Sequence, residues 1–200
     1  MIKSIIFDLG RVLLTFEPED YVYRLYGKGE KARILYKAVF GSKTWLDLDR
    51  GTVDYGEAVR IMSADCEDYA KDIEYLLYNW VEIMMPIEEN VDLLKELKMK
   101  GYNLYLLSNF HEKAFGRVFE KYGFFELFDG IFISSHYRLL KPEREIYQEM
   151  LEKFSLNPDE CIFIDDTPAN VSAAEELGIK GIVFRDPESL RQELKNHEIL

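Results

Sequence analysis

The chain has 200 residues, of which 48% are hydrophobic, so it can form one compact domain or a core domain that carries a smaller insertion. Its 37 acidic and 25 basic residues give a formal net charge of −12, which argues against nucleic acids and anionic membranes as partners. The two cysteines are too far apart in sequence for a metal-binding motif, and charged residues interrupt the only apolar run near the N-terminus. These features favour a cytoplasmic protein with reduced thiols and no membrane segment.

The first predicted element is a short apolar strand, Ile5–Phe7, and a carboxylate, Asp8, follows it at once. A continuous apolar run of this length is typical of a strand that is buried on both faces. Asp8 at the edge of a core costs free energy unless it is paired, hydrogen-bonded or metal-bound. On this stretch alone, a turn or helix cap is the simpler interpretation of Asp8.

A long segment with helical patterns comes next, and no part of it alternates in the manner of a strand. Its expected elements are a helix from Pro18 to a stop at Gly27, helices over Glu30–Phe40 and Glu67–Met84, a helix capped by Asp54, and a turn within Trp45–Tyr55. We therefore predict an all-helical cap over residues 16–85. The cap divides an α/β catalytic core into residues 1–15 and 86–200.

After Pro86 the pattern changes to an alternation of strands and helices. The predicted strands are Tyr102–Leu107, Ile131–Ser134, Cys161–Ile164 and Gly181–Phe184. Such alternation predicts a parallel sheet with right-handed crossovers and helices on both faces. The expected fold class is α/β, with a three-layer, Rossmann-like parallel sheet core and an inserted all-helical cap.

Polar side chains follow the predicted strands at the points where they end: Asp8, Ser108 with Asn109, Ser134 with Ser135, Asp165 with Asp166, and Lys141 after a short loop. Because the carboxyl ends of parallel strands meet at one edge of a sheet, we expect these groups to converge. Three carboxylates at one edge would repel one another, and a hard cation with oxygen ligands, most plausibly Mg²⁺, relieves that repulsion. A cation, an anion site and a free carboxylate together indicate phosphoryl transfer onto Asp8.

Four short motifs in this order resemble the haloacid dehalogenase superfamily of phosphatases over nearly the whole chain: Ile6–Gly10, Leu107–Asn109, Lys141–Glu143 and Ile164–Asp166. The sequence looks closest to the branch that contains alpha-D-glucose-1-phosphate phosphatase. The resemblance implies that Asp8 is the nucleophile and a Mg²⁺ ligand, that Asp166 is a second ligand, and that Asp165 supports the metal directly or through water. It also implies that Lys141 ties the phosphoryl group to Asp8. The expected site contains catalytic Asp8, Ser108 and Lys141, substrate-binding Ser108, Asn109, Lys141 and Arg50, and metal ligands Asp8, Gly10, Asp165 and Asp166.

One position departs from the family pattern. Most phosphatases of the superfamily carry an acid–base aspartate two residues after the nucleophile, and here that position is Gly10. The Gly10 carbonyl can still bind Mg²⁺, but no side chain remains to move protons. An acid must then come from the cap, from His111 or from water, or the enzyme must act on substrates whose leaving group needs less help, such as a sugar 1-phosphate. Two alternatives therefore stay open: a 2-haloacid dehalogenase-like hydrolase, which the Asp165–Asp166 pair disfavours, and a catalytically idle phosphosugar-binding protein.

The cap is expected to select the substrate. It is too small to enclose a macromolecule and large enough to cover a small leaving group, so we predict small phosphorylated metabolites, with sugar phosphates, possibly a sugar 1-phosphate, first. Trp45, Asp47 and Arg50 are the residues expected to alter substrate choice. We expect a monomer or a weak dimer.

Overall fold

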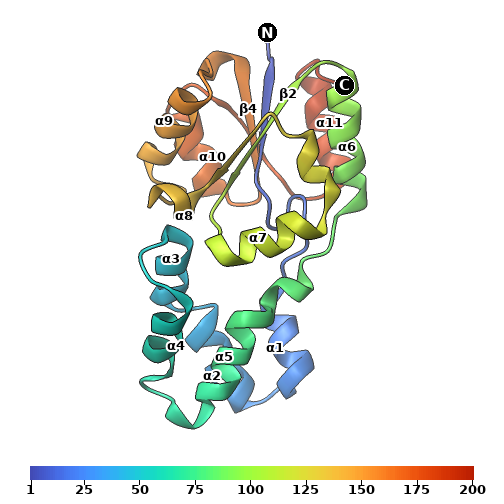
Figure 1. Ribbon diagram of the computed structural model, residues 1–200. Coiled ribbons are helices and arrows are strands. Elements are labelled where there is room, and N and C mark those ends of the chain that lie inside the picture. Colours follow the sequence, from blue (N-terminus) through green and yellow to red (C-terminus); the bar gives the residue numbers. More distant parts are fainter.

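A parallel sheet forms the upper lobe of the computed structural model, which describes all of residues 1–200 (Figure 1). Its five strands lie in the order β3-β2-β1-β4-β5. Their bounds are β1 Ser4–Phe7, β2 Asn103–Ser108, β3 Gly130–Ile133, β4 Cys161–Asp165 and β5 Lys180–Val183. The central strand β1 is buried along its whole length, as the apolar run Ile5–Phe7 predicts. The predicted fold class is confirmed.

Helices cover both faces of the sheet because its side chains alternate between two apolar layers. Ile6 packs with residues of α9 (Arg144–Lys153) and α10 (Pro168–Glu175), whereas Ile5 and Phe7 belong to the cluster that contains α6 (Glu88–Met99) and α11 (Pro187–Asn196). Figure 1 shows these helix pairs on opposite sides of the strands. No helix is both long enough and apolar enough to cross a bilayer.

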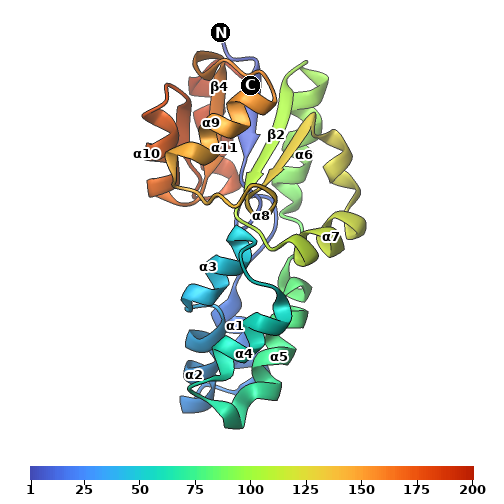
Figure 2. The same cartoon turned by 60° about the vertical axis from the view of Figure 1, so that its left-hand side comes forward.

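The lower lobe is entirely helical and inserts after the first strand (Figures 1 and 2). It contains α1 Pro18–Tyr26, α2 Glu30–Val39, α3 Lys43–Arg50, α4 Tyr55–Ser63 and α5 Ala70–Asn79, with 3₁₀ turns at Glu67–Tyr69 and Trp80–Ile83. The chain leaves and re-enters the core side by side, because the Thr15 N–H donates to the Met85 carbonyl over 2.8 Å and the Ile87 N–H to the Leu13 carbonyl over 2.9 Å. This pairing supports our proposed division at residues 15 and 86.

Three elements around the lobe junction complete the core. Helix α7 (Glu112–Lys121) and a 3₁₀ turn at Gly123–Leu127 follow β2, and the short helix α8 (Ser134–Tyr137) follows β3. A further 3₁₀ turn, Pro158–Glu160, precedes β4. The prediction of a loop directly after β3 is therefore wrong, because α8 forms there. Strand β3 also ends one residue earlier than predicted.

The structure also adds a helix to the cap: α3 occupies the first part of Trp45–Tyr55, and the turn predicted within this stretch is confined to Gly51–Val53. The Ser42 hydroxyl accepts a hydrogen bond from the Trp45 N–H over 3.1 Å and caps the helix, and Gly51 ends it in the left-handed conformation, with φ of 72°. The predicted helix over Glu67–Met84 ends at Asn79, where the chain tightens into a 3₁₀ turn.

Candidate active site

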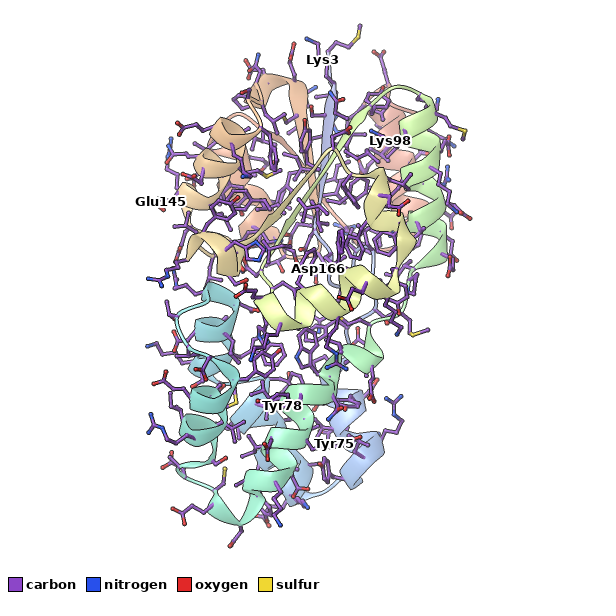
Figure 3. The ribbon with its side chains drawn as sticks, in the orientation of Figure 1. Lys3, Tyr75, Tyr78, Lys98, Glu145 and Asp166 are labelled. Atoms are coloured by element: carbon purple, nitrogen blue, oxygen red, sulfur yellow. The ribbon has the colours of Figure 1, made fainter.

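The polar residues that follow the strands converge at the edge of the sheet that faces the cap. The Asp8 N–H donates to the Ile164 carbonyl over 2.9 Å, so the end of β1 lies beside the end of β4 and its Asp165. Figure 3 places Asp166 between the two lobes, whereas Lys3, which precedes β1, lies at the far end of the sheet. The convergence that the strand pattern predicts is thus present.

Lys141 links two of the carboxylates. Its Nζ atom lies 2.7 Å from Asp8 Oδ1 and 2.6 Å from Asp165 Oδ2, and it donates a third hydrogen bond to the Leu107 carbonyl over 3.0 Å. All three ammonium protons therefore have an acceptor, which compensates for the burial of this charge. Burial lowers the pKa of Lys141, but Asp8 and Asp165 outweigh it, so the net pKa lies above the ordinary value.

The Asp8 carboxyl is difficult to ionise in this surrounding. Its pKa is raised to about 7: burial is the largest cause, Lys141 lowers the pKa in part, and the charge of Asp165 adds to the rise. A nucleophilic carboxylate at neutral pH therefore needs more positive charge than Lys141 alone provides.

The two neighbouring aspartates at the end of β4 differ in their surroundings. Asp165 is fully buried, and its Oδ1 accepts hydrogen bonds from the Thr167 N–H over 2.8 Å and from the Asn170 amide over 3.0 Å. Asp166 is half-buried and lines the pocket, and burial followed by the charge of Asp165 raises its pKa. Asp165 is thus the residue that holds Lys141, and Asp166 is the one that faces a ligand.

This edge of the sheet fits a divalent cation. Asp8, Asp165 and Asp166 each have a carboxylate oxygen within 4.8 Å of the others, and hard oxygen donors of this kind suit Mg²⁺. Asp8, Asp166 and the Gly10 carbonyl are the groups that would hold the ion, with Asp165 behind them. A bound cation would supply charge that neutralises both the carboxylates and a phosphoryl group.

We expect Mg²⁺ to stabilise the protein because it relieves the repulsion among these carboxylates. At about 100 times its dissociation constant, Mg²⁺ should add ~2.7 kcal/mol to the free energy of unfolding. For a chain of this size the gain corresponds to a rise in Tm of roughly 5–10 °C. Thermal denaturation with MgCl₂ and with NaCl at equal ionic strength measures the effect. Asp166→Asn should lose most of the rise, and an equal rise in this variant would place the ion elsewhere.

The cap covers these groups with an apolar wall. A cavity of about 190 Å³ lies against Asp8, Ser108 and Lys141, a volume that suits a small molecule. Arg11 lines the same cavity, and its guanidinium lies 3.8 Å from Asp166. The cap and its connections contribute Phe16, Trp45, Asp49, Trp80 and Met84. Asp49 is thus the single charged residue that the cap places in the pocket.

Asn109 is held between two loops. Its amide donates to the Lys141 carbonyl over 3.0 Å, and its Oδ1 accepts from the Lys141 N–H over 2.9 Å. Asn109 therefore fixes the loop that carries Lys141, and it also lines the pocket together with Ser108. Contact of Ser108 and Asn109 with a phosphoryl group stays a prediction.

Arg50 does not line the pocket, so the structure does not support the prediction that it binds substrate. Its guanidinium forms a two-pronged pair with Glu143 of the core, with one contact of 2.9 Å, and it donates to the Arg138 carbonyl over 3.2 Å. The pKa of Glu143 is lowered by this hydrogen bond. Arg50 therefore fastens the cap to the core.

The helical geometry of α3 explains why Trp45 lines the pocket as expected, whereas the other two expected cap residues, Asp47 and Arg50, do not. Residues four apart share a helix face, so Asp49 lies on the side of Trp45, toward the pocket. Asp47 does not line the pocket and lies 3.9 Å from the exposed Lys43. Recognising the capping serine, Ser42, would have identified this helix, but not which of its faces turns toward the pocket.

His111 is buried behind Asp49 and does not line the pocket. Its side chain is 1% exposed, and it lies against the ring of Trp45, with centroids 4.3 Å apart. Nε2 lies 3.2 Å from Asp49 Oδ1 without a hydrogen bond of regular geometry, and Nδ1 lies 3.3 Å from the Tyr55 hydroxyl. Burial lowers the pKa of His111 to about 3, so the ring is neutral and is not the missing acid.

The Asp49 carboxyl is also difficult to ionise in its surroundings. Burial raises its pKa well above the ordinary range, and the negative charge of Asp8 raises it further, against the pull of Lys141. Sequence reasoning assigned no role to Asp49 or Arg11. It assigned no role to Asn170 either, although the amide of this residue donates to Asp165.

The chain is similar to known proteins in both sequence and fold. A family model described as haloacid dehalogenase-like hydrolase matches residues 2–178. The chain is similar to a sesquiterpene phosphatase of Aspergillus oryzae, with 28% identity over 96% of this chain and 95% of that protein. It is similar to a D-ribitol-5-phosphate phosphatase of Bacteroides thetaiotaomicron, with 25% identity over 97% of each chain. In fold it is similar to a crystal structure of a HAD family enzyme from Bacteroides thetaiotaomicron in complex with magnesium and inorganic phosphate, with a TM-score of 0.74 and 23% identity over 95% of this chain and 99% of that one.

Proposed function

The chain belongs to the haloacid dehalogenase-like hydrolases, and from that premise we propose that it is a Mg²⁺-dependent phosphatase of small organic monophosphates. The observation that carries the proposal is Lys141, buried between Asp8 and Asp165 beside the pocket-facing Asp166. The phosphatase relatives support it. The Asp165–Asp166 pair disfavours the dehalogenase alternative, because displacement of halide from carbon needs no divalent cation.

The proposed reaction has two halves, both centred on Asp8. A carboxylate oxygen of Asp8 attacks phosphorus, the bond between phosphorus and the leaving oxygen breaks, and the leaving oxygen takes up a proton. Water then attacks phosphorus, the bond to Asp8 breaks, and inorganic phosphate leaves. Lys141 keeps the Asp8 carboxylate in place, while the cap excludes bulk water from the first half.

The pocket wall favours an apolar leaving group over the sugar phosphates expected from the sequence. Phe16, Trp45, Trp80 and Met84 offer a sugar little to hydrogen-bond, apart from the indole N–H groups, and Asp49 is the one cap carboxyl. A hydroxyl buried without a partner costs about 1–3 kcal/mol. The similarity to a sesquiterpene phosphatase supports an apolar substrate, whereas the ribitol-5-phosphate relative and the glucose-1-phosphate resemblance support a sugar.

Release of inorganic phosphate from a matched panel tests the proposal. The panel contains geranyl, farnesyl and benzyl monophosphates beside glucose 1-phosphate and ribitol 5-phosphate, each with MgCl₂ or excess chelator. We expect activity only with the cation, and kcat/KM for the apolar esters at least about tenfold above that for the sugars, because one unpaired buried hydroxyl is worth that factor. Activity in excess chelator would contradict the cation requirement, and a preference for the sugars would contradict the role of the apolar wall.

A further inference from the structure

The proposed function requires a proton donor that the core does not supply. The position two residues after the nucleophile is Gly10, which has no side chain to donate a proton. Asp8 is the nucleophile, and the three ammonium protons of Lys141 are donated to Asp8, Asp165 and the Leu107 carbonyl. The other charged residues of the pocket are Arg11, Asp49 and Asp166. A guanidinium does not give up its proton, and Asp166 belongs to the proposed cation site. Of these three residues, Asp49 is therefore the one left to act as proton donor.

We propose that Asp49, on cap helix α3, is the catalytic acid that protonates the leaving oxygen, and that the buried His111 is the positioning residue that orients it. This inference rests on the proposed phosphatase function. It assigns to the cap a step that the core cannot perform.

The docking of α3 on the core fixes the position of Asp49. The Ser134 hydroxyl, at the start of α8, donates to the Asp49 carbonyl, and the next residue, Arg50, pairs with Glu143. Gly51 ends the helix against the core so closely that a Cβ there would lie 2.4 Å from the Ser135 carbonyl oxygen. The backbone on both sides of Asp49 is therefore attached to the edge of the sheet that carries Asp8.

The surroundings of the Asp49 side chain suit proton transfer. The side chain is 10% exposed, it opens into the pocket that contains Asp8, and its Oδ1 lies 3.2 Å from His111 Nε2. Burial raises the pKa of Asp49 well above its ordinary value, which favours the protonated form that can donate to a leaving oxygen. Trp45 and Trp80 pack against the His111 ring, with centroids 4.3 Å and 5.3 Å away, and so fix its orientation.

The proton balances over one turnover. As the bond from phosphorus to the leaving oxygen breaks, the Asp49 carboxyl gives its proton to that oxygen and becomes a carboxylate. In the second half, this carboxylate takes a proton from the water that attacks phosphorus. The carboxyl is then restored as inorganic phosphate leaves.

Two esters with similar rings but different leaving groups test this role. Benzyl phosphate releases a strongly basic alkoxide that needs a proton, whereas 4-nitrophenyl phosphate releases a weakly basic phenolate that does not. Asp49→Asn should lower kcat/KM for benzyl phosphate by ~10²–10⁴-fold and change the value for the aryl ester far less. Asp47→Asn is the matched control, because this carboxylate lies on the same helix outside the pocket, and it should leave both values unchanged.

The aryl ester also reports whether the variant is folded, and Asp49→Ala provides a second variant for the same comparison. Equal losses on both esters in the two variants, or no loss on benzyl phosphate, would overturn the role of Asp49. If wild-type protein hydrolyses neither ester with Mg²⁺, the proposed function itself fails. His111→Gln, which keeps a hydrogen-bonding group, should retain more of the benzyl activity than His111→Leu, and equal activity in the two would overturn the positioning role.

Discussion

Asp8→Asn should abolish turnover of every phosphate ester, with a loss in kcat of roughly 10⁴-fold or more, while the protein stays folded. The amide has almost the shape of the carboxyl but cannot form the acyl-phosphate bond. Asp8 is buried directly after β1, and because the amide has nearly the same volume, the change opens no cavity. Phosphate release measures the activity, and circular dichroism measures the fold.

The same variant should change how stability depends on pH. Since the folded-state pKa of Asp8 is raised from 3.8 to about 7, the native state of the metal-free protein holds a proton that the unfolded state has lost between these values. The contribution of Asp8 therefore lowers the free energy of unfolding as pH rises from about 4 to 7. This part of the pH dependence should be absent in Asp8→Asn. Urea denaturation at pH 5 and pH 8 measures the difference, with Asp47→Asn as control. Wild-type activity in Asp8→Asn would show that Asp8 is not the nucleophile.

Lys141→Met should destabilise the protein as well as inactivate it. The change leaves Asp8 and Asp165 facing each other without the ammonium that now lies within 2.7 Å of both. Removing one partner of a buried ion pair typically costs ~3–5 kcal/mol, which predicts a fall in Tm of roughly 10 °C or more. Thermal denaturation measures the fall, and MgCl₂ should recover part of it because a cation can replace the lost charge.

Lys95→Met is the matched control for this effect. Lys95 lies 2.8 Å from Asp92, but both side chains are more than half exposed, so solvent screens the pair and its loss should change the stability little. If Lys141→Met lowered the Tm no more than Lys95→Met does, Lys141 would not be the group that holds the two carboxylates together. Phosphatase activity in Lys141→Met near the wild-type level would contradict its catalytic role.

The α/β core and the meeting of its polar residues follow from the sequence. Alternating strand and helix patterns predict parallel strands, and parallel strands bring their carboxyl ends to one edge. Asp8, Ser108, Asp165 and Asp166 each end or directly follow a strand, so their convergence needs only the correct strand pattern. These predictions succeed because they rest on local patterns and on one geometric rule.

Apart from Trp45, the cap residues of the pocket could not be predicted from the sequence, because their positions depend on contacts between segments far apart in the chain. Arg50 pairs with Glu143, 93 residues away, and the Asp49 carbonyl accepts from Ser134, 85 residues away. The partner on the core decides which side chain of α3 turns inward, and no local pattern contains that information. The same limit applies to His111, whose burial against Trp45 and Trp80 removes it from the candidates for the missing acid.

The sequence by itself determined the sheet, the helical insertion and the residues that follow each strand, because hydrophobic periodicity and strand ends are properties of neighbouring residues. Only the tertiary structure separated Asp165, which holds Lys141, from Asp166, which faces the pocket. It also placed Asp49 rather than Arg50 in the pocket. Burial and the charges of distant residues decide these roles, and both exist only once the two lobes pack together.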